Sequence, residues 1–194
     1  MIGEIKRQCE FALIAAEDLG RALYRQDKIK QQIARSTWAD FPESYFDEQN
    51  KVWLNVQSLL IALANVSKLL WPTKQPGRRQ LLRNLLQIEE DSVLKSRELR
   101  NHFEHIDERI ETWYKELDKG LVMDGGIAPS NGTTAGVKNY LRWFDTSLFA
   151  VTFRGNVYEL VPLLEAARML EASAARLLEE LSTQDAQEVK GQLQ

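Results

Sequence analysis

The chain has 194 residues, of which 44% are hydrophobic, and its 25 basic and 28 acidic side chains give a net charge of −3. This length suits one domain with a buried core and is short for two. The negative net charge argues against a protein that coats nucleic acid without specificity. The single cysteine, Cys9, excludes an internal disulfide, and we expect it to be a small core residue on the first helix.

The most apolar segment, Leu59 to Val66, is too short to cross a bilayer, and the first residues lack a signal-peptide pattern. We therefore expect a cytoplasmic protein with no membrane segment.

Apolar residues recur at helical spacing in several segments, which predicts an amphipathic helix for each. The widest apolar face belongs to the second segment, which should be central in the core and should end at Trp71-Pro72. Residues 183–194 are polar and are expected to fray. The expected helices cover Ile5 to about Gln32, Ser44 or Asp47 to Leu70, Arg78 to Ile88, Ser92 to about Lys119, and Leu163 to Leu181.

Residues 121–137 are rich in Gly, Pro, Ser and Asn and predict a mobile loop. Residues 140–160 are rich in aromatic and β-branched residues, with Gly155-Asn156 as a tight turn. The fold class that follows is mainly α: an up-down bundle of about five helices with a small β-hairpin or meander before the last helix. We expect one domain over residues 1–182, with the β appendage at about 140–160.

The segment from Leu99 to Trp113 concentrates titratable and phosphate-binding groups in the pattern R-N-x-x-x-H. On a helix, Arg100 and His105 are about 7.5 Å apart along the axis and about 140° apart around it. Their side chains could flank one phosphate only near the rim of a groove. The alternative is a solvated face with ion pairs such as Arg100 with Glu104. The opposite side should form a buried stripe of Leu99, Phe103, Ile106, Ile110, Trp113, Tyr114 and Leu117.

This pattern resembles the R-x(4 to 6)-H signature of the HEPN superfamily (higher eukaryotes and prokaryotes nucleotide-binding domain), small helical bundles that include metal-independent endoribonucleases, often toxins. The runs LRNHFEHIDERIETW and FDTSLFAVTFRGNVYEL also resemble the motif helix and the last hairpin of uncharacterised bacterial members. The resemblance implies a homodimer in which two motif helices meet in a composite cleft. The nucleotidyltransferase half of some members is missing here, so a separate partner chain would supply it.

Metal-independent RNA cleavage needs a group that transfers protons and a cation that stabilises the phosphorane. His105 is the candidate acid or base, because the unperturbed pKa of histidine is about 6.5. Arg100 is the candidate for the phosphorane charge, since its planar fork binds two phosphate oxygens. Asn101 would orient the phosphate or fix Arg100. Glu108 either tunes His105 or is an ordinary solvent-facing charge, and the sequence leaves this open.

His102 lies toward the apolar edge, where a half-buried core histidine is expected. With His105 it forms H-x-x-H, which could start a metal site with Glu98 or Glu108. The chain has only these two histidines, and we expect no metal or other cofactor.

The stretch from Lys68 to Arg100 carries eight basic residues against four acidic ones and leads directly into the motif. It is either the footprint of an RNA backbone or a basic surface of no special purpose. The candidate RNA-binding residues are Arg78, Arg79, Arg83 and Arg97.

The function we expect is RNA binding, with toxin-type endoribonuclease activity at a dimer site and a separate antitoxin as a further partner. One alternative is a non-catalytic module of the same fold that binds nucleotides or proteins. Another is a plain helical partner-binding protein in which the motif is accidental.

Overall fold

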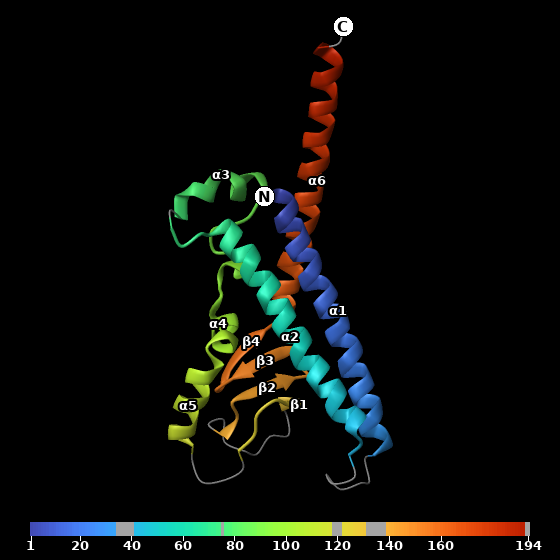
Figure 1. The fold of residues 1–194 in the computed structure, drawn as a ribbon, viewed down its shortest axis with the longest axis vertical. Helices are drawn as coiled ribbons and strands as arrows, with labels where there is room; N and C mark the ends of the chain where they lie inside the picture. The colour runs from blue at the N-terminus through green and yellow to red at the C-terminus, as the bar shows by residue number, and fades with distance from the viewer. Residues whose placement is uncertain (34–40, 75, 118–121, 131–138, 193–194) are drawn as a thin grey trace.

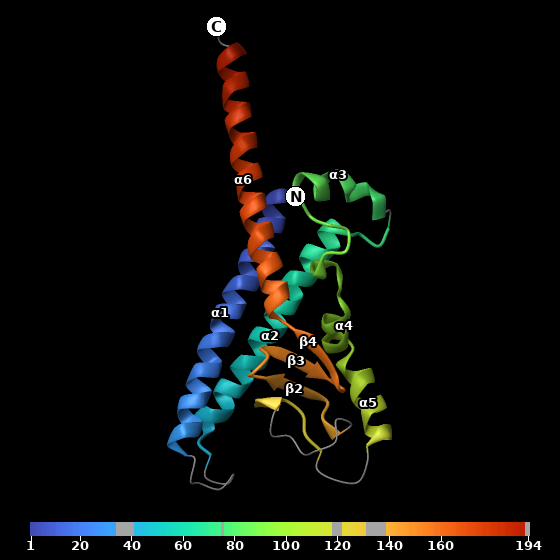
Figure 2. The ribbon, with the colours of Figure 1, turned by 180° about the vertical axis from the view of Figure 1, so that it is seen from behind.

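In the computed structural model, the protein is mainly helical with a small four-stranded sheet (Figures 1 and 2). The structure describes residues 1–33, 41–74, 76–117, 122–130 and 139–192. Within these ranges the helices are α1 Ile2–Gln32, α2 Glu43–Leu70, α3 Gln80–Leu85, α4 Glu98–Glu104, α5 Ile106–Glu116 and α6 Val161–Gln192, with 3₁₀ turns η2 Pro76–Arg79 and η3 Val93–Lys95. The strands are β1 Gly126–Ala128, β2 Arg142–Asp145, β3 Ala150–Phe153 and β4 Asn156–Glu159.

The core lies where α1 packs against α2 and α6. Each helix contributes side chains from the face that its apolar spacing predicts, and burial of each large side chain stabilises the fold by about 1.5–3 kcal/mol. Cys9 is fully buried on α1, as expected. Fully buried side chains at this junction are Ile5, Leu19, Val52, Val56 and Leu59.

Helix α2 is long and apolar enough, by length and composition, to cross a membrane, with a mean hydropathy of 1.3 over its most apolar window. However, 56% of that window is buried inside the protein. Glu48 is also buried on this helix, where it pairs with Lys51 at 2.7 Å. Burial of this extent is what a core helix shows, and such helices pass the same test of length and composition.

Helix α6 is longer than the sequence predicts. Only Leu160 separates the end of β4 at Glu159 from the start of α6 at Val161. The helix runs to Gln192 rather than ending near Leu181. In both ribbon views its C-terminal half extends past the N-terminus of α1 (Figures 1 and 2). The expectation that the chain frays from residue 183 is therefore replaced by helix as far as residue 192.

The sheet has the order β1-β2-β3-β4, with β1 parallel to β2 and the other pairs antiparallel. Strands β2 to β4 fall in the range expected for β structure, whereas β1 falls in the segment expected to be a mobile loop; residues 121 and 131–137 of that segment lie outside the described residues.

Two contacts with α2 fix the start of β1. The backbone oxygen of Gly125 accepts hydrogen bonds from Trp53 Nε1 at 2.9 Å and Gln49 Nε2 at 2.8 Å. Gly125 has φ of 72°, a conformation that favours glycine. A Cβ on Gly126 would lie 2.3 Å from the Trp143 ring. Both glycines are thus required where the sheet meets α2.

The prediction of a single long helix from Ser92 to Lys119 is wrong. The chain forms η3, then α4 and α5, with a break at His105, whose φ and ψ are −103° and 39°. Ser96 is extended, and the backbone oxygen of Lys95 accepts a hydrogen bond from Ser67 Oγ of α2 at 2.9 Å, so helix cannot run through this segment. Helix α5 ends at Glu116, and residues 118–121, including the expected stop at Gly120, lie outside the described residues.

The break also changes which side chains are buried. Leu99 and Trp113 are buried, and Phe103, Ile106 and Leu117 pack against the core, as expected. Ile110 and Tyr114 are instead 43% and 74% exposed. The non-helical backbone of His105 means that one helical stripe no longer describes both α4 and α5.

Candidate functional site

Helix α4 is held by two aromatic contacts and one buried leucine. The Phe103 ring lies 6.1 Å from Trp53 of α2 and 6.2 Å from Phe153 of β3, measured between ring centroids. Leu99 is buried one turn earlier. These anchors place the intervening polar residues of the motif at the surface between α2 and the sheet.

Arg100 lies at the rim of a cavity and is only 17% exposed. It forms an ion pair with Glu104, the pair that the solvated-face alternative predicts. Its Nη1 also donates to Asn101 Oδ1 at 3.3 Å. Burial and the nearby charge of Arg97 lower the pKa of Arg100. Its Nε is buried without a partner among the described residues.

Arg100 belongs to a cluster of three cations, which we call the cationic cluster: Lys68, Arg97 and Arg100. Partial burial, Arg100 and Arg97 all lower the pKa of the Lys68 ammonium group. Between residues that the structure describes, neither Lys68 nor Arg97 forms an ion pair, so Glu104 is the cluster's one carboxylate partner. The cluster has unmatched positive charge of the kind that attracts an anion.

The cavity beside the cluster has a volume of about 230 Å³. Helix α2, the η3–α4 segment, the end of β4 and the start of α6 line it, and the cavity opens to solvent on one side. Its walls are mainly aliphatic, with Leu60 and Leu63 from α2, Leu99 from α4 and Leu163 from α6. Both Arg97 and Arg100 line it.

His105 has different surroundings from Arg100. It lies at the break between α4 and α5, is 55% exposed, and is not among the residues that line the cavity. Glu108 lies close to its ring, with 3.8 Å between His105 Nδ1 and Glu108 Oε1. The helix break gives His105 an accessible ring, while Arg100 is turned toward α2 and the cavity. Within one chain, the side chains of Arg100 and His105 therefore do not line the same cavity.

His102 is the half-buried histidine that the sequence predicts, with 19% of its side chain exposed. Its ring stacks on Phe153 with centroids 4.5 Å apart, and its Nε2 lies 3.2 Å from the Tyr158 hydroxyl. That hydroxyl donates to Glu98 at 3.0 Å, so Nε2 must be the protonated nitrogen that donates to Tyr158. Burial, followed by the charge of Arg109, lowers the pKa of His102, and burial raises the pKa of Tyr158 to about 12.

The sequence did not identify the second set of cations near the motif. Arg154 in the turn between β3 and β4 and Arg109 on α5 both act electrostatically on His102. Arg154 is also paired with Glu116 of α5 at 2.5 Å. Only the positive φ of Arg154, 46°, distinguishes this turn residue, and the sequence carries no signal that places it beside α4.

The four candidate RNA-binding arginines do not form one surface. Arg97 lies in the cationic cluster, whereas Arg78 and Arg79 belong to η2, and η2 and α3 lie beside the N-terminus of α1, away from α4 and α5 (Figures 1 and 2). Arg78 is exposed, and Arg79 is partly buried.

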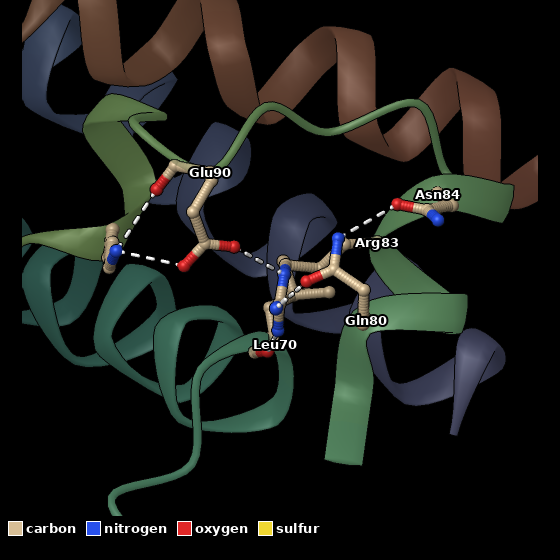
Figure 3. Close-up of polar contacts among 6 residues, drawn as sticks. Leu70, Gln80, Arg83, Asn84 and Glu90 are labelled. Carbon is tan, nitrogen blue, oxygen red and sulfur yellow. Dashed lines mark hydrogen bonds and ion pairs between the residues drawn. The ribbon is translucent and has the colours of Figure 1, made fainter. Parts of the chain in front are cut away.

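The expectation that Arg83 binds RNA is corrected by its burial, because only 2% of the residue is exposed. Figure 3 shows its guanidinium between Leu70, Gln80 and Glu90. It donates to the backbone oxygen of Leu70 at 2.7 Å and to Gln80 at 2.7 Å, and it pairs with Glu90 at 2.9 Å. Arg83 joins α3 to the end of α2 and has a structural role.

Among the described residues, no three His, Cys, Asp or Glu side chains group as metal ligands would. Burial raises the pKa of Cys9 to about 12, which leaves it as an unreactive thiol at neutral pH. No protein-family model, curated protein or solved structure matches this chain. What the site can do therefore follows from its geometry and chemistry.

Proposed function

We propose that the protein binds RNA at α4, with the cationic cluster of Lys68, Arg97 and Arg100 neutralising the phosphate backbone. The observation that supports this most is the unmatched charge of the cluster, whose Arg100 lies five residues before His105 and its accessible ring. Phosphate contacts of this kind supply most of the affinity for nucleic acid. The negative net charge of the rest of the chain would restrict binding to this face.

We further propose that two copies cleave RNA without a metal ion. One His105 would accept the proton of a ribose 2′-hydroxyl as its oxygen attacks phosphorus, and the His105 of the second copy would protonate the departing 5′-oxygen. The products are a 2′,3′-cyclic phosphate and a 5′-hydroxyl. Arg100 would leave its ion pair with Glu104 and bind the negatively charged phosphorane. Glu108 would hold the ring of His105 in place. The dimer supplies the second histidine because one chain offers only one accessible histidine.

This proposal also includes membership of the HEPN superfamily and an up-down arrangement of the bundle with a hairpin before the last helix. It further includes a cytoplasmic location and an antitoxin partner. The second candidate is a non-catalytic nucleotide-binding module. One observation favours it: Arg100 is paired with Glu104 and turned into the cavity, away from His105.

RNA cleavage by purified variants tests the enzyme. His105→Ala and Arg100→Ala should each lower the rate by at least about 100-fold, the usual contribution of a general acid or base. The exposed Arg168→Ala on α6 is the matched control and should cut as fast as the wild type. Cleavage should persist in a chelator, and light scattering should show a dimer.

If wild-type protein cuts no RNA but still binds it, and His105→Ala does not alter binding, the non-catalytic candidate replaces the enzyme. A strict monomer that cleaves RNA would contradict the composite site.

A further inference from the structure

We infer that the cavity between α2, α4, β4 and α6 binds a small aliphatic carboxylate of about six to eight carbons in all. The site shares Arg97 and Arg100 with the proposed RNA-binding surface, but His105 does not line it. Carboxylate binding is measured without RNA, so the inference can hold whether or not the protein binds or cleaves RNA.

The size of the cavity sets the size of the ligand. An apolar cavity of about 150 Å³ holds benzene, so one of 230 Å³ holds roughly nine non-hydrogen atoms. A carboxylate with six to eight carbons has eight to ten such atoms by this same estimate, roughly the number that fits.

The walls favour an aliphatic tail over a nucleobase. Aliphatic side chains from α2, η3, α4 and α6 make up most of the lining, and the small side chain of Ala64 is among them. Tyr158 is the one aromatic residue that lines the cavity, and its hydroxyl is engaged with Glu98 and His102. A base would lack the stacking partner that nucleotide sites usually provide.

The rim favours an anionic head group. Arg97 and Arg100 line the cavity, and Arg97 has no carboxylate partner among the described residues. A carboxylate could accept two hydrogen bonds from one guanidinium fork. Glu159 also lines the rim but is exposed, so the two arginines and nearby Lys68 leave the opening positive.

Calorimetric titration of the whole protein tests this with octanoate as the probe. Octanoate should bind at a ratio of one to one, and affinity should rise about fourfold per methylene from butanoate to octanoate, then level off at dodecanoate. Octylamine, which has the same tail and the opposite charge, should not bind detectably.

Two variants separate the head from the tail. Arg97→Gln should weaken octanoate about tenfold and leave octanol unchanged, because it removes a charged hydrogen bond alone. Leu163→Trp should abolish both by filling the cavity, and Arg168→Gln should change neither. Equal binding of octylamine and octanoate, no saturable octanoate binding, or displacement of octanoate by AMP with higher affinity would each overturn the inference.

If Leu163→Trp does not fold, Ala64→Leu provides the same test of the tail from the opposite wall. Octanoate binding that survives in a folded filled variant would contradict the location. Loss of RNA cleavage in His105→Ala with octanoate binding intact would separate this site from the proposed enzyme.

Discussion

Arg83 on α3 and Arg100 on α4 come from the same basic stretch, yet their guanidinium groups lie in opposite surroundings. Arg83 is buried among a carboxylate, an amide oxygen and a backbone oxygen that match its donors (Figure 3). Arg100 has one carboxylate partner and lies close to two other cations. A count of local charge therefore cannot separate a structural arginine from one available to an anion.

The largest expected effect is on stability at the α3 side. Arg83→Ala should lower the free energy of unfolding by about 1–3 kcal/mol, because it leaves the buried backbone oxygen of Leu70 without its donor and removes the bond to Gln80. The exposed Arg78→Ala is the matched control and should change it by less than about 0.5 kcal/mol. Urea unfolding followed by circular dichroism measures both. Equal, small losses would mean that Arg83 is not the link between α3 and α2.

Substitution of the carboxylate partners of the two arginines should show the same contrast in stability, with a smaller effect: Glu90, the partner of Arg83, should matter more than Glu104, the partner of Arg100. Glu90→Gln should lower the free energy of unfolding by less than Arg83→Ala does, because Glu90 is exposed but binds both Arg83 and Lys95. Glu104→Gln should cost less than about 0.5 kcal/mol, as for a surface ion pair. It should also tighten RNA binding, since Arg100 is then released to phosphate. Weaker RNA binding by Glu104→Gln would show that Glu104 positions Arg100 instead of competing for it.

The smallest effect concerns His102, whose pKa is lowered by burial and by Arg109. Between this lowered pKa and the unfolded value of about 6.5, the unfolded chain binds the proton more readily, so stability falls as pH drops below about 6.5. His102→Gln should remove this part of the pH dependence, even if it is less stable throughout. Thermal melts from pH 8 to pH 5 would measure the slopes. Parallel slopes in the two proteins would rule out His102 as the source.

The parts of the fold that the sequence predicts are those with a long periodic pattern. Apolar spacing gives α1, α2 and the start of α6, because burying one face dominates the energetics of a long helix. The strand β1 is missed because three residues carry no pattern of their own. It forms because Gly125 binds Trp53 and Gln49 of α2 and because β2 lies alongside.

The candidate site is predicted less completely, because its features depend on contacts between distant segments. The sequence identifies Arg100, Asn101 and the half-buried His102, but not the break at His105, which interrupts an otherwise regular helical pattern. Lys68 joins Arg100 only because α4 packs on α2. The burial of Arg83 is missed because a charged residue in a basic stretch is expected at the surface.

The salt dependence of RNA binding tests the central contrast between these two regions most directly. The double variant Lys68→Ala, Arg97→Ala and the double variant Arg78→Ala, Arg79→Ala each remove two positive charges from one stretch. The first should make the slope of log affinity against log salt concentration about 1.4 less steep, because each phosphate contact with a single strand contributes about 0.7 to that slope. The second should leave the slope unchanged. Equal flattening by both variants, or by neither, would contradict the assignment of the cationic cluster as the RNA-binding surface.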